Sequence, residues 1–79
     1  MNQNEFSTYD LGVATALITL GHNLVRLEKD NPKKTLFVFE NNGKIQQAIN
    51  SYWNDKLKLP AQILFNNQKM LKNRIYSDM

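Results

Sequence analysis

The stretch NLVRLEKDNPKKTLFVFE, residues 23–40, decides the fold class of this chain. Residues 23–29 and 34–40 are rich in β-branched, aromatic and other apolar residues, which favours two strands. The segment DNPK between them combines proline with Asx residues, which is typical of a turn. The pattern therefore predicts an antiparallel hairpin over residues 22–40. Simple alternation places Val25 and Leu27 on the same face as Lys29.

The second strand of this hairpin is apolar on both faces. Phe37 and Phe39 alternate onto one face, and Leu36 and Val38 onto the other. A strand of this kind is central in its sheet or has a second surface that something covers. Leu36 and Val38 are accordingly candidates for an interface with a second copy of the chain, which would be a homodimer, or with another protein.

The remaining segments predict an α+β fold. EFSTYD (5–10) is a short extended run, and LGVATALITL (11–20) is a helix with Asp10 as its N-cap and Gly21 at its C′ position. A second helix begins within residues 40–56, capped by Asn41 or Asn42, and a third covers 60–77. The predicted order is β-α-β-β-α-α, with a small antiparallel sheet packed against two to three helices in one domain of residues 1–79. Residues 1–4 and 77–79 are expected to fray.

Both later helices carry an apolar stripe at helical spacing. In the second helix the expected core positions are Ile45, Ala48, Ile49, Tyr52 and Trp53, and in the third they are Ala61, Leu64, Phe65, Leu71 and Ile75, with Gln68 in the same row. Trp53 is thus predicted to anchor the core. The alternative for Trp53 is a stacking platform or a hot spot at a partner surface.

Composition argues against catalysis. The chain has no cysteine, which excludes disulfides and thiolate chemistry, and its one histidine, His22, is expected to complete the end of the first helix. The seven acidic residues are scattered, and no phosphate-binding loop or nucleophile motif is present. We therefore expect no enzyme, metal or cofactor. The start of the chain does not resemble a signal peptide and no apolar run is long enough to span a membrane, so the expected location is cytoplasmic.

Charge is distributed unevenly along the chain. Residues 1–40 hold four cations and five acids, whereas residues 41–79 hold six cations and two acids, within a total of +3. An excess of cations in one half is typical of a surface that faces a polyanion.

The third helix concentrates this charge. At about 100° per residue, Phe65, Lys69, Lys72 and Tyr76 fall on one side of it. Cations interleaved with aromatic rings suit nucleic acid, because cations hold phosphates and rings stack on bases. The predicted contact residues are Lys56, Lys58, Lys69, Lys72, Arg74 and Tyr76, and a secondary basic cluster at the hairpin tip comprises Lys29, Lys33 and Lys34. The alternative is a solvated helix face whose cations complement the helix dipole.

The chain also resembles an uncharacterised family of small phage and bacterial proteins over residues 6–77. The resemblance rests on FSTYDLGVATALITLG, which fits F-x-T-x-D-L-x-x-A-x-x-L-x-x-x-G, on LFVFE, on the Tyr-Trp pair and on the closing LKNRIY. It implies one compact domain in a phage or mobile-element setting and assigns no catalytic or binding residue.

Together these patterns predict a small accessory protein that binds nucleic acid through its basic C-terminal helix. The alternative is a protein–protein interaction module that modulates a host or phage enzyme, for example an inhibitor of a defence nuclease.

Overall fold

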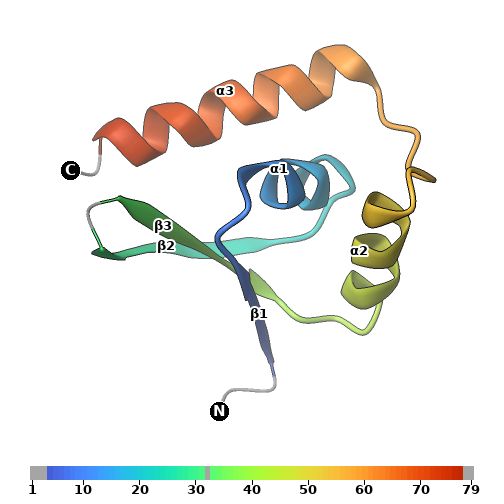
Figure 1. Cartoon of the computed structure of the whole chain (residues 1–79), viewed down its shortest axis with the longest axis horizontal. Helices are drawn as coiled ribbons and strands as arrows, with labels where there is room; N and C mark the ends of the chain where they lie inside the picture. Colours follow the sequence, from blue (N-terminus) through green and yellow to red (C-terminus); the bar gives the residue numbers. More distant parts are fainter. Residues whose placement is uncertain (1–3, 32, 78–79) are drawn as a thin grey trace.

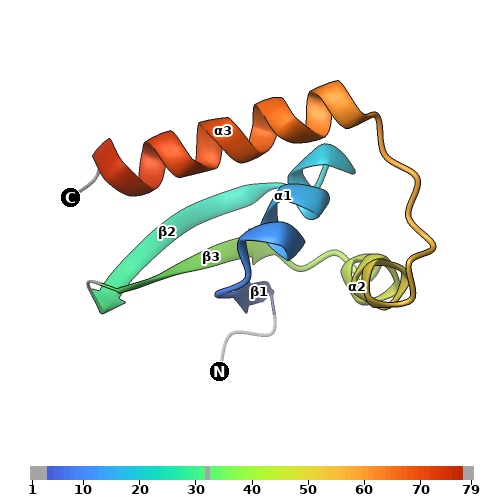
Figure 2. The same ribbon diagram turned by 45° about the horizontal axis from the view of Figure 1, so that its top comes forward.

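A three-stranded antiparallel sheet and three helices make up the computed structural model, which describes residues 4–31 and 33–77. The elements follow the predicted order β-α-β-β-α-α (Figure 1): β1 (Glu5–Thr8), α1 (Leu11–Thr19), β2 (Leu24–Asn31), β3 (Lys34–Glu40), α2 (Ile45–Trp53) and α3 (Ala61–Ser77). Helices α1 and α3 lie over one face of the sheet, and α2 packs against α1 beyond the end of the strands (Figures 1 and 2). The fold is the α+β arrangement that the sequence predicts.

Strand β3 lies in the centre of the sheet, in the order β1-β3-β2. Phe6 pairs with Phe39 on one side, and Leu27 pairs with Phe37 on the other. Phe37, Val38 and Phe39 are all buried, so the two apolar faces of this strand are both covered. LFVF left two alternatives open, a central strand or a second surface that something covers, and β3 is both central and covered on its second face.

The register of β2 differs from simple alternation. Leu24 pairs with Phe39 but Arg26 pairs with Val38, so Val25 is the extra residue of an irregularity in the ladder. Leu27 therefore keeps its place beside Phe37, whereas Val25 leaves the ladder and is 45% exposed. The expectation that Val25 shares a face with Leu27 and Lys29 is wrong, because a one-residue shift turns the side chains over.

Helix α1 has the ends that the sequence predicts. The Asp10 carboxylate accepts a hydrogen bond from the Val13 amide at 3.0 Å, which satisfies a donor of the first turn. At the other end Gly21 has φ +95°, and the His22 and Gly21 amides donate to the carbonyls of Leu17 and Ile18, both at 2.9 Å. This is the Schellman pattern, which needs a left-handed residue after the helix.

Helix α2 starts later than predicted. Its N-cap is Lys44, without a side-chain cap, and the Asn42 side chain instead accepts from the Lys44 amide at 3.2 Å. Gly43, with φ +55°, separates Asn42 from the helix. The predicted capping by Asn41 or Asn42 is therefore wrong, since the chain turns once more before α2 begins.

The core joins α1, the sheet and one residue from each of the other helices. Its buried members are Val13, Ala14, Leu17, Phe37, Phe39, Ile45 and Leu71. Burying a side chain as large as phenylalanine contributes about 1.5–3 kcal/mol. Of the ends predicted to fray, Asn4 accepts from the Asn41 amide at 2.8 Å and Ser77 is the last residue of α3; the others, residues 1–3 and 78–79, lie outside the described residues.

Candidate nucleic-acid interface

The inward side of α3 holds this helix against α1. Leu71 is fully buried in the core, and Ile75 packs against the core. The side-chain amide of Asn67 donates a hydrogen bond to the Thr19 hydroxyl at 3.0 Å. The Lys29 ammonium from β2 donates to the Ile75 carbonyl and so satisfies an acceptor in the last turn of α3. Two apolar contacts and two polar ones thus fix which side of α3 faces solvent.

One outward flank of α3 carries what we call the aromatic-basic row, comprising Phe65, Lys69, Lys72 and Tyr76. All four side chains are exposed, and the two rings are 64% and 68% exposed. The predicted core position of Phe65 is therefore wrong, and so is that of Ala61. Neither lysine has a hydrogen bond or ion pair with any residue that the structure describes, and the helix itself contains no acidic residue.

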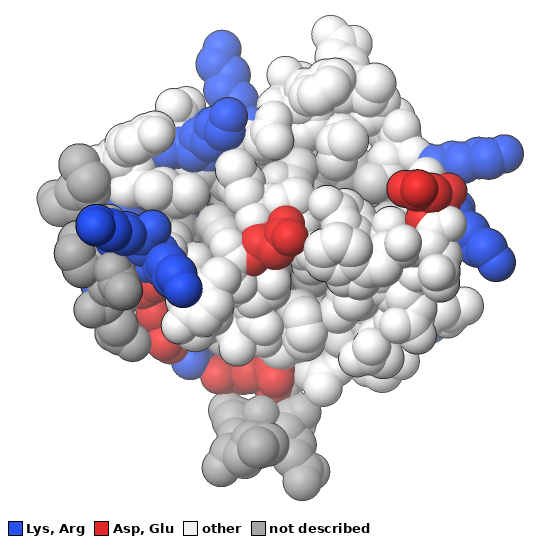
Figure 3. All heavy atoms as spheres, in the orientation of Figure 1, with Lys and Arg blue, Asp and Glu red and all other residues white. Residues whose placement is uncertain are grey.

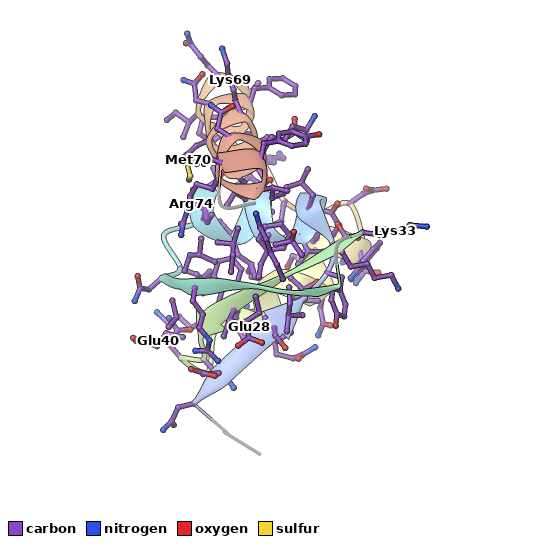
Figure 4. All side chains as sticks on the ribbon, turned by 90° about the vertical axis from the view of Figure 1, so that its left-hand side faces the viewer. Glu28, Lys33, Glu40, Lys69, Met70 and Arg74 are labelled. Atoms are coloured by element: carbon purple, nitrogen blue, oxygen red, sulfur yellow. The ribbon has the colours of Figure 1, made fainter. Side chains whose placement is uncertain are left out.

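Arg74 lies on the other flank of α3. It follows Phe65 by nine residues, about two and a half helical turns, so the two side chains point in opposite directions. Figure 4 shows Arg74 beside Met70 on one side of the helix, with Lys69 at its crest. Arg74 and Lys69 are both exposed, but the structure does not bring Arg74 into line with the aromatic-basic row.

Lys56 and Lys58 lie in the connection between α2 and α3, beyond the N-terminal end of α3. They are exposed, and the described residues provide them with no ion pair. In Figure 3 the Lys and Arg atoms gather at two ends of the molecule, one near the C-terminal half of α3 and the hairpin tip and one near this connection, with a mostly uncharged surface between them. The predicted contact residues thus form two groups rather than one patch.

The secondary basic cluster at the hairpin tip lies at the same end of the molecule as the C-terminal half of α3 (Figures 1 and 4). Two of its members have roles within the fold. Lys29 binds the Ile75 carbonyl, as described above, and the Lys34 ammonium lies 5.7 Å from the centre of the Tyr9 ring. Lys33 stands in the turn at the tip.

The outer face of the sheet, which carries Glu5, Arg26, Glu28, Leu36 and Val38, is turned away from α3. Arg26 on β2 donates to Glu28 on its own strand at 2.7 Å and reaches across β3 to Glu5 on β1, also at 2.7 Å. Because Val38 is the β3 partner of Arg26, the arginine stem crosses above it, and Val38 is only 2% exposed. Val38 thus offers a partner almost no surface, while Leu36 is half-buried.

The ion pair between Arg26 and Glu5 shifts the pKa of both residues. Hydrogen bonding to Arg26 lowers the pKa of Glu5, while hydrogen bonding to Glu5 and Glu28 raises the pKa of Arg26. Both shifts favour the charged forms. The outer sheet face therefore satisfies its own charges.

An open groove lies between α1, α2, α3 and the connection that precedes α3. Its volume is about 560 Å³, and its lining residues are Gly12, Thr15, Ala16, Tyr52, Trp53, Asp55, Leu57, Leu59, Leu64, Phe65 and Gln68. Trp53 is 63% exposed at its edge, so the predicted role of Trp53 as a core anchor is wrong. Trp53 is the last residue of α2, and at about 100° per residue it falls at the edge of the stripe that faces the core.

The Tyr52 ring contacts the Trp53 ring. The two rings meet edge to face with centres 5.0 Å apart. The Tyr52 hydroxyl lies so close to Gly12 that a Cβ at that position would be 2.4 Å away, which explains the glycine in the first turn of α1. Burial raises the pKa of Tyr52, and the carboxylates of Asp10 and Asp55 raise it further, so the phenol stays protonated. Sequence periodicity did not reveal this groove, because its walls come from four separate segments.

The remaining candidate, His22, follows α1 as the sequence predicts. Its backbone closes the helix end, and its Nδ1 atom is buried without a hydrogen-bond partner among the described residues. The part of the chain that the structure describes contains no group of three or more side chains that could hold a metal ion. None of the described helices has both the length and the apolar character needed to cross a membrane.

Comparison with protein families identifies a domain of unknown function (DUF5659) that matches residues 3–77. The chain belongs to this family. The match confirms the resemblance to a family without an assigned activity, and it covers every element of the fold. Comparisons with curated proteins and with solved structures give no match.

Proposed function

We propose that this DUF5659 protein binds nucleic acid through the aromatic-basic row of α3. The observation that supports the proposal is the state of the row: two cations and two rings are exposed on one flank of a helix without acidic residues. Cations without an internal partner are free to neutralise phosphates, and each phosphate contact releases counterions and so favours binding.

The geometry of the row favours a single strand. Phe65 and Tyr76 are eleven residues apart, about 16 Å along a helix, which matches a few nucleotides at roughly 3.4 Å each. Exposed rings stack on bases only where the bases are unpaired, and such stacking tolerates any sequence. Lys69 and Lys72 lie between the rings and would hold phosphates without reading sequence. We place this activity in an accessory protein of a phage or mobile element, the setting that the sequence resemblance implies, and in the cytoplasm, the location expected from the lack of a signal peptide pattern.

The test is the fluorescence anisotropy of labelled single-stranded and duplex oligonucleotides, titrated with protein at about 50 and 200 mM salt. The double variant Lys69→Glu/Lys72→Glu is expected to bind at least ~10-fold more weakly. Because each phosphate contact on a single strand contributes about 0.7 to the slope of log K against log salt, removing two should lower that slope by about 1.4.

The matched control is Lys44→Glu, which changes the net charge as much as the single variant Lys72→Glu does. Lys44 precedes α2 and belongs neither to the row nor to the other predicted contact residues. The control should keep the slope of the original protein. Equal losses in Lys44→Glu and Lys72→Glu would show that net charge alone drives binding, and unchanged binding by the double variant would refute the proposal.

The alternative function, a protein–protein interaction module, draws on the other flank of α3. Ile63 and Met70 are exposed there, near Arg74. An exposed apolar strip with a cation is common at protein interfaces. A partner that co-purifies despite nuclease treatment, and despite Lys69→Glu/Lys72→Glu, would favour this function. A homodimer through Leu36 and Val38 would appear as a doubled mass in light scattering.

A further inference from the structure

We infer that the groove between Trp53 and Phe65 receives an unpaired nucleobase of a bound single strand. This inference rests on the proposed function and deepens it, because it assigns the base to a built site rather than to an exposed ring. The groove and the aromatic-basic row share Phe65, so a strand that follows the row reaches the groove without leaving the surface.

Size and lining of the groove suit a planar aromatic ring. Its volume of about 560 Å³ lies within the ~300–1,000 Å³ typical of ligand sites. Ala16, Leu57, Leu59 and Leu64 provide apolar walls, and the exposed rings of Trp53 and Phe65 stand at the mouth. The edge-to-face contact with Tyr52 described above restricts the Trp53 ring before any base binds.

Polar groups in the groove suit the edge of a base. Asp55 and Gln68 are both lining residues. Asp55 has φ +57°, a left-handed conformation that aspartate tolerates, and its amide donates to the Tyr52 carbonyl at 3.2 Å. A carboxylate accepts hydrogen bonds from exocyclic amino groups, such as N4 of cytosine. The same carboxylate repels phosphate, so the base rather than the backbone is the part that enters.

Cations flank the groove on both sides. Lys69 follows Phe65 by one helical turn, and Lys56 and Lys58 alternate with the lining residues Leu57 and Leu59 in the connection before α3. A strand whose base occupies the groove would therefore have cations for the phosphates before and after that base. This arrangement gives a reason for the two separate basic groups noted above.

The experiment uses Trp53 as its reporter, because it is the only tryptophan of the chain. Ten-nucleotide dC and dT strands, an abasic strand of the same length and a duplex are titrated, with anisotropy and tryptophan emission recorded together. Stacking should quench the emission with dC10 and less with dT10, since thymine lacks an amino group. The abasic strand should bind through its phosphates without quenching, and the duplex should not quench.

Two ring variants separate the groove from the row. Phe65→Ala should weaken dC10 binding by about 5- to 150-fold, the range for losing one stacked base, and should reduce the quenching at saturation. Tyr76→Ala, which removes a ring of the row outside the groove, should weaken binding but leave the quenching at saturation unchanged. Both side chains are exposed, so both variants should fold.

The outcomes distinguish the inference from the proposed function. Absence of anisotropy change with every oligonucleotide would overturn both. Salt-dependent binding without quenching by dC10, or equal quenching by the duplex, would overturn the groove assignment and leave the role of the aromatic-basic row intact. Unchanged dC10 binding by Phe65→Ala would count against both, because Phe65 belongs to the groove and to the row.

Discussion

The outer face of the sheet and the aromatic-basic row of α3 combine charged and apolar side chains in opposite ways. On the sheet, Arg26 lies between Glu5 and Glu28 and its stem crosses Val38, so charge and apolar surface are both satisfied within the chain. On α3, Lys69 and Lys72 lie between Phe65 and Tyr76, and all four side chains are exposed.

The comparison distinguishes charged side chains that stabilise the fold, such as Arg26, from charged side chains that are available to bind a ligand, such as Lys69 and Lys72. Exposed ion pairs contribute little free energy by themselves, but a long arginine side chain can also cover apolar surface. Cations without a partner add nothing of this kind to the fold, and they create a positive potential that attracts polyanions. We therefore expect substitutions on the two surfaces to have different consequences, stability for the sheet and binding for α3.

The largest expected effect contrasts the two sides of α3. Leu71→Ala removes a fully buried side chain and should lower the free energy of unfolding by about 2–5 kcal/mol. Phe65→Ala on the exposed flank should change it by no more than about 0.5 kcal/mol. Urea denaturation followed by circular dichroism measures both. A large loss from Phe65→Ala would show that the aromatic-basic row belongs to the fold and would break the comparison.

A smaller effect is expected on the sheet. Arg26→Ala uncovers Val38 and removes the ion-pair partner of Glu5 and Glu28. Its melting temperature should fall further than that of Lys72→Ala, whose side chain has no described partner. Arg26→Lys should lie between them, because an ammonium cannot make the fork of bonds that a guanidinium makes. Thermal melts at low and high salt give the order; a Lys72→Ala melt as low as that of Arg26→Ala would contradict it.

The smallest effect is a pH dependence that belongs to the sheet alone. The pKa of Glu5 is lower in the folded chain than the ordinary value of 4.5 because Arg26 binds its charged form. Its contribution to stability is therefore complete above about pH 4.5 and is lost as the pH falls through the folded pKa. Glu5→Gln should be less stable than the original protein at pH 7, and the gap should close in acid. A gap that stays constant down to pH 3 would remove Glu5 from this role.

Much of the fold could be predicted from local patterns. The hairpin, the Asp10 cap and the Gly21 helix end follow from residues that have few other conformational uses. The errors occur where one residue shifts a pattern. Val25 leaves the ladder at an irregularity, α2 starts beyond Gly43, and Trp53 stands past the point where α2 faces the core.

The candidate site was partly predictable for the same reason. Helical geometry alone placed Phe65, Lys69, Lys72 and Tyr76 on one side of α3, and the structure leaves that side exposed. The same geometry separates Arg74 from them, which a closer count of residues would have shown. The groove had no sequence signal, because its lining residues have no common period and come from both ends of the chain.

The sequence by itself determined the class of the fold, the ends of α1, the two apolar faces of β3 and the charge of α3, because each depends on neighbours within a few residues. Only the tertiary structure decided that Arg26 crosses Val38, that Lys29 binds the last turn of α3, and that Trp53 and Phe65 line the same groove. These contacts join residues far apart in the chain. Their formation depends on how α1 packs between the sheet and α3, which no local pattern encodes.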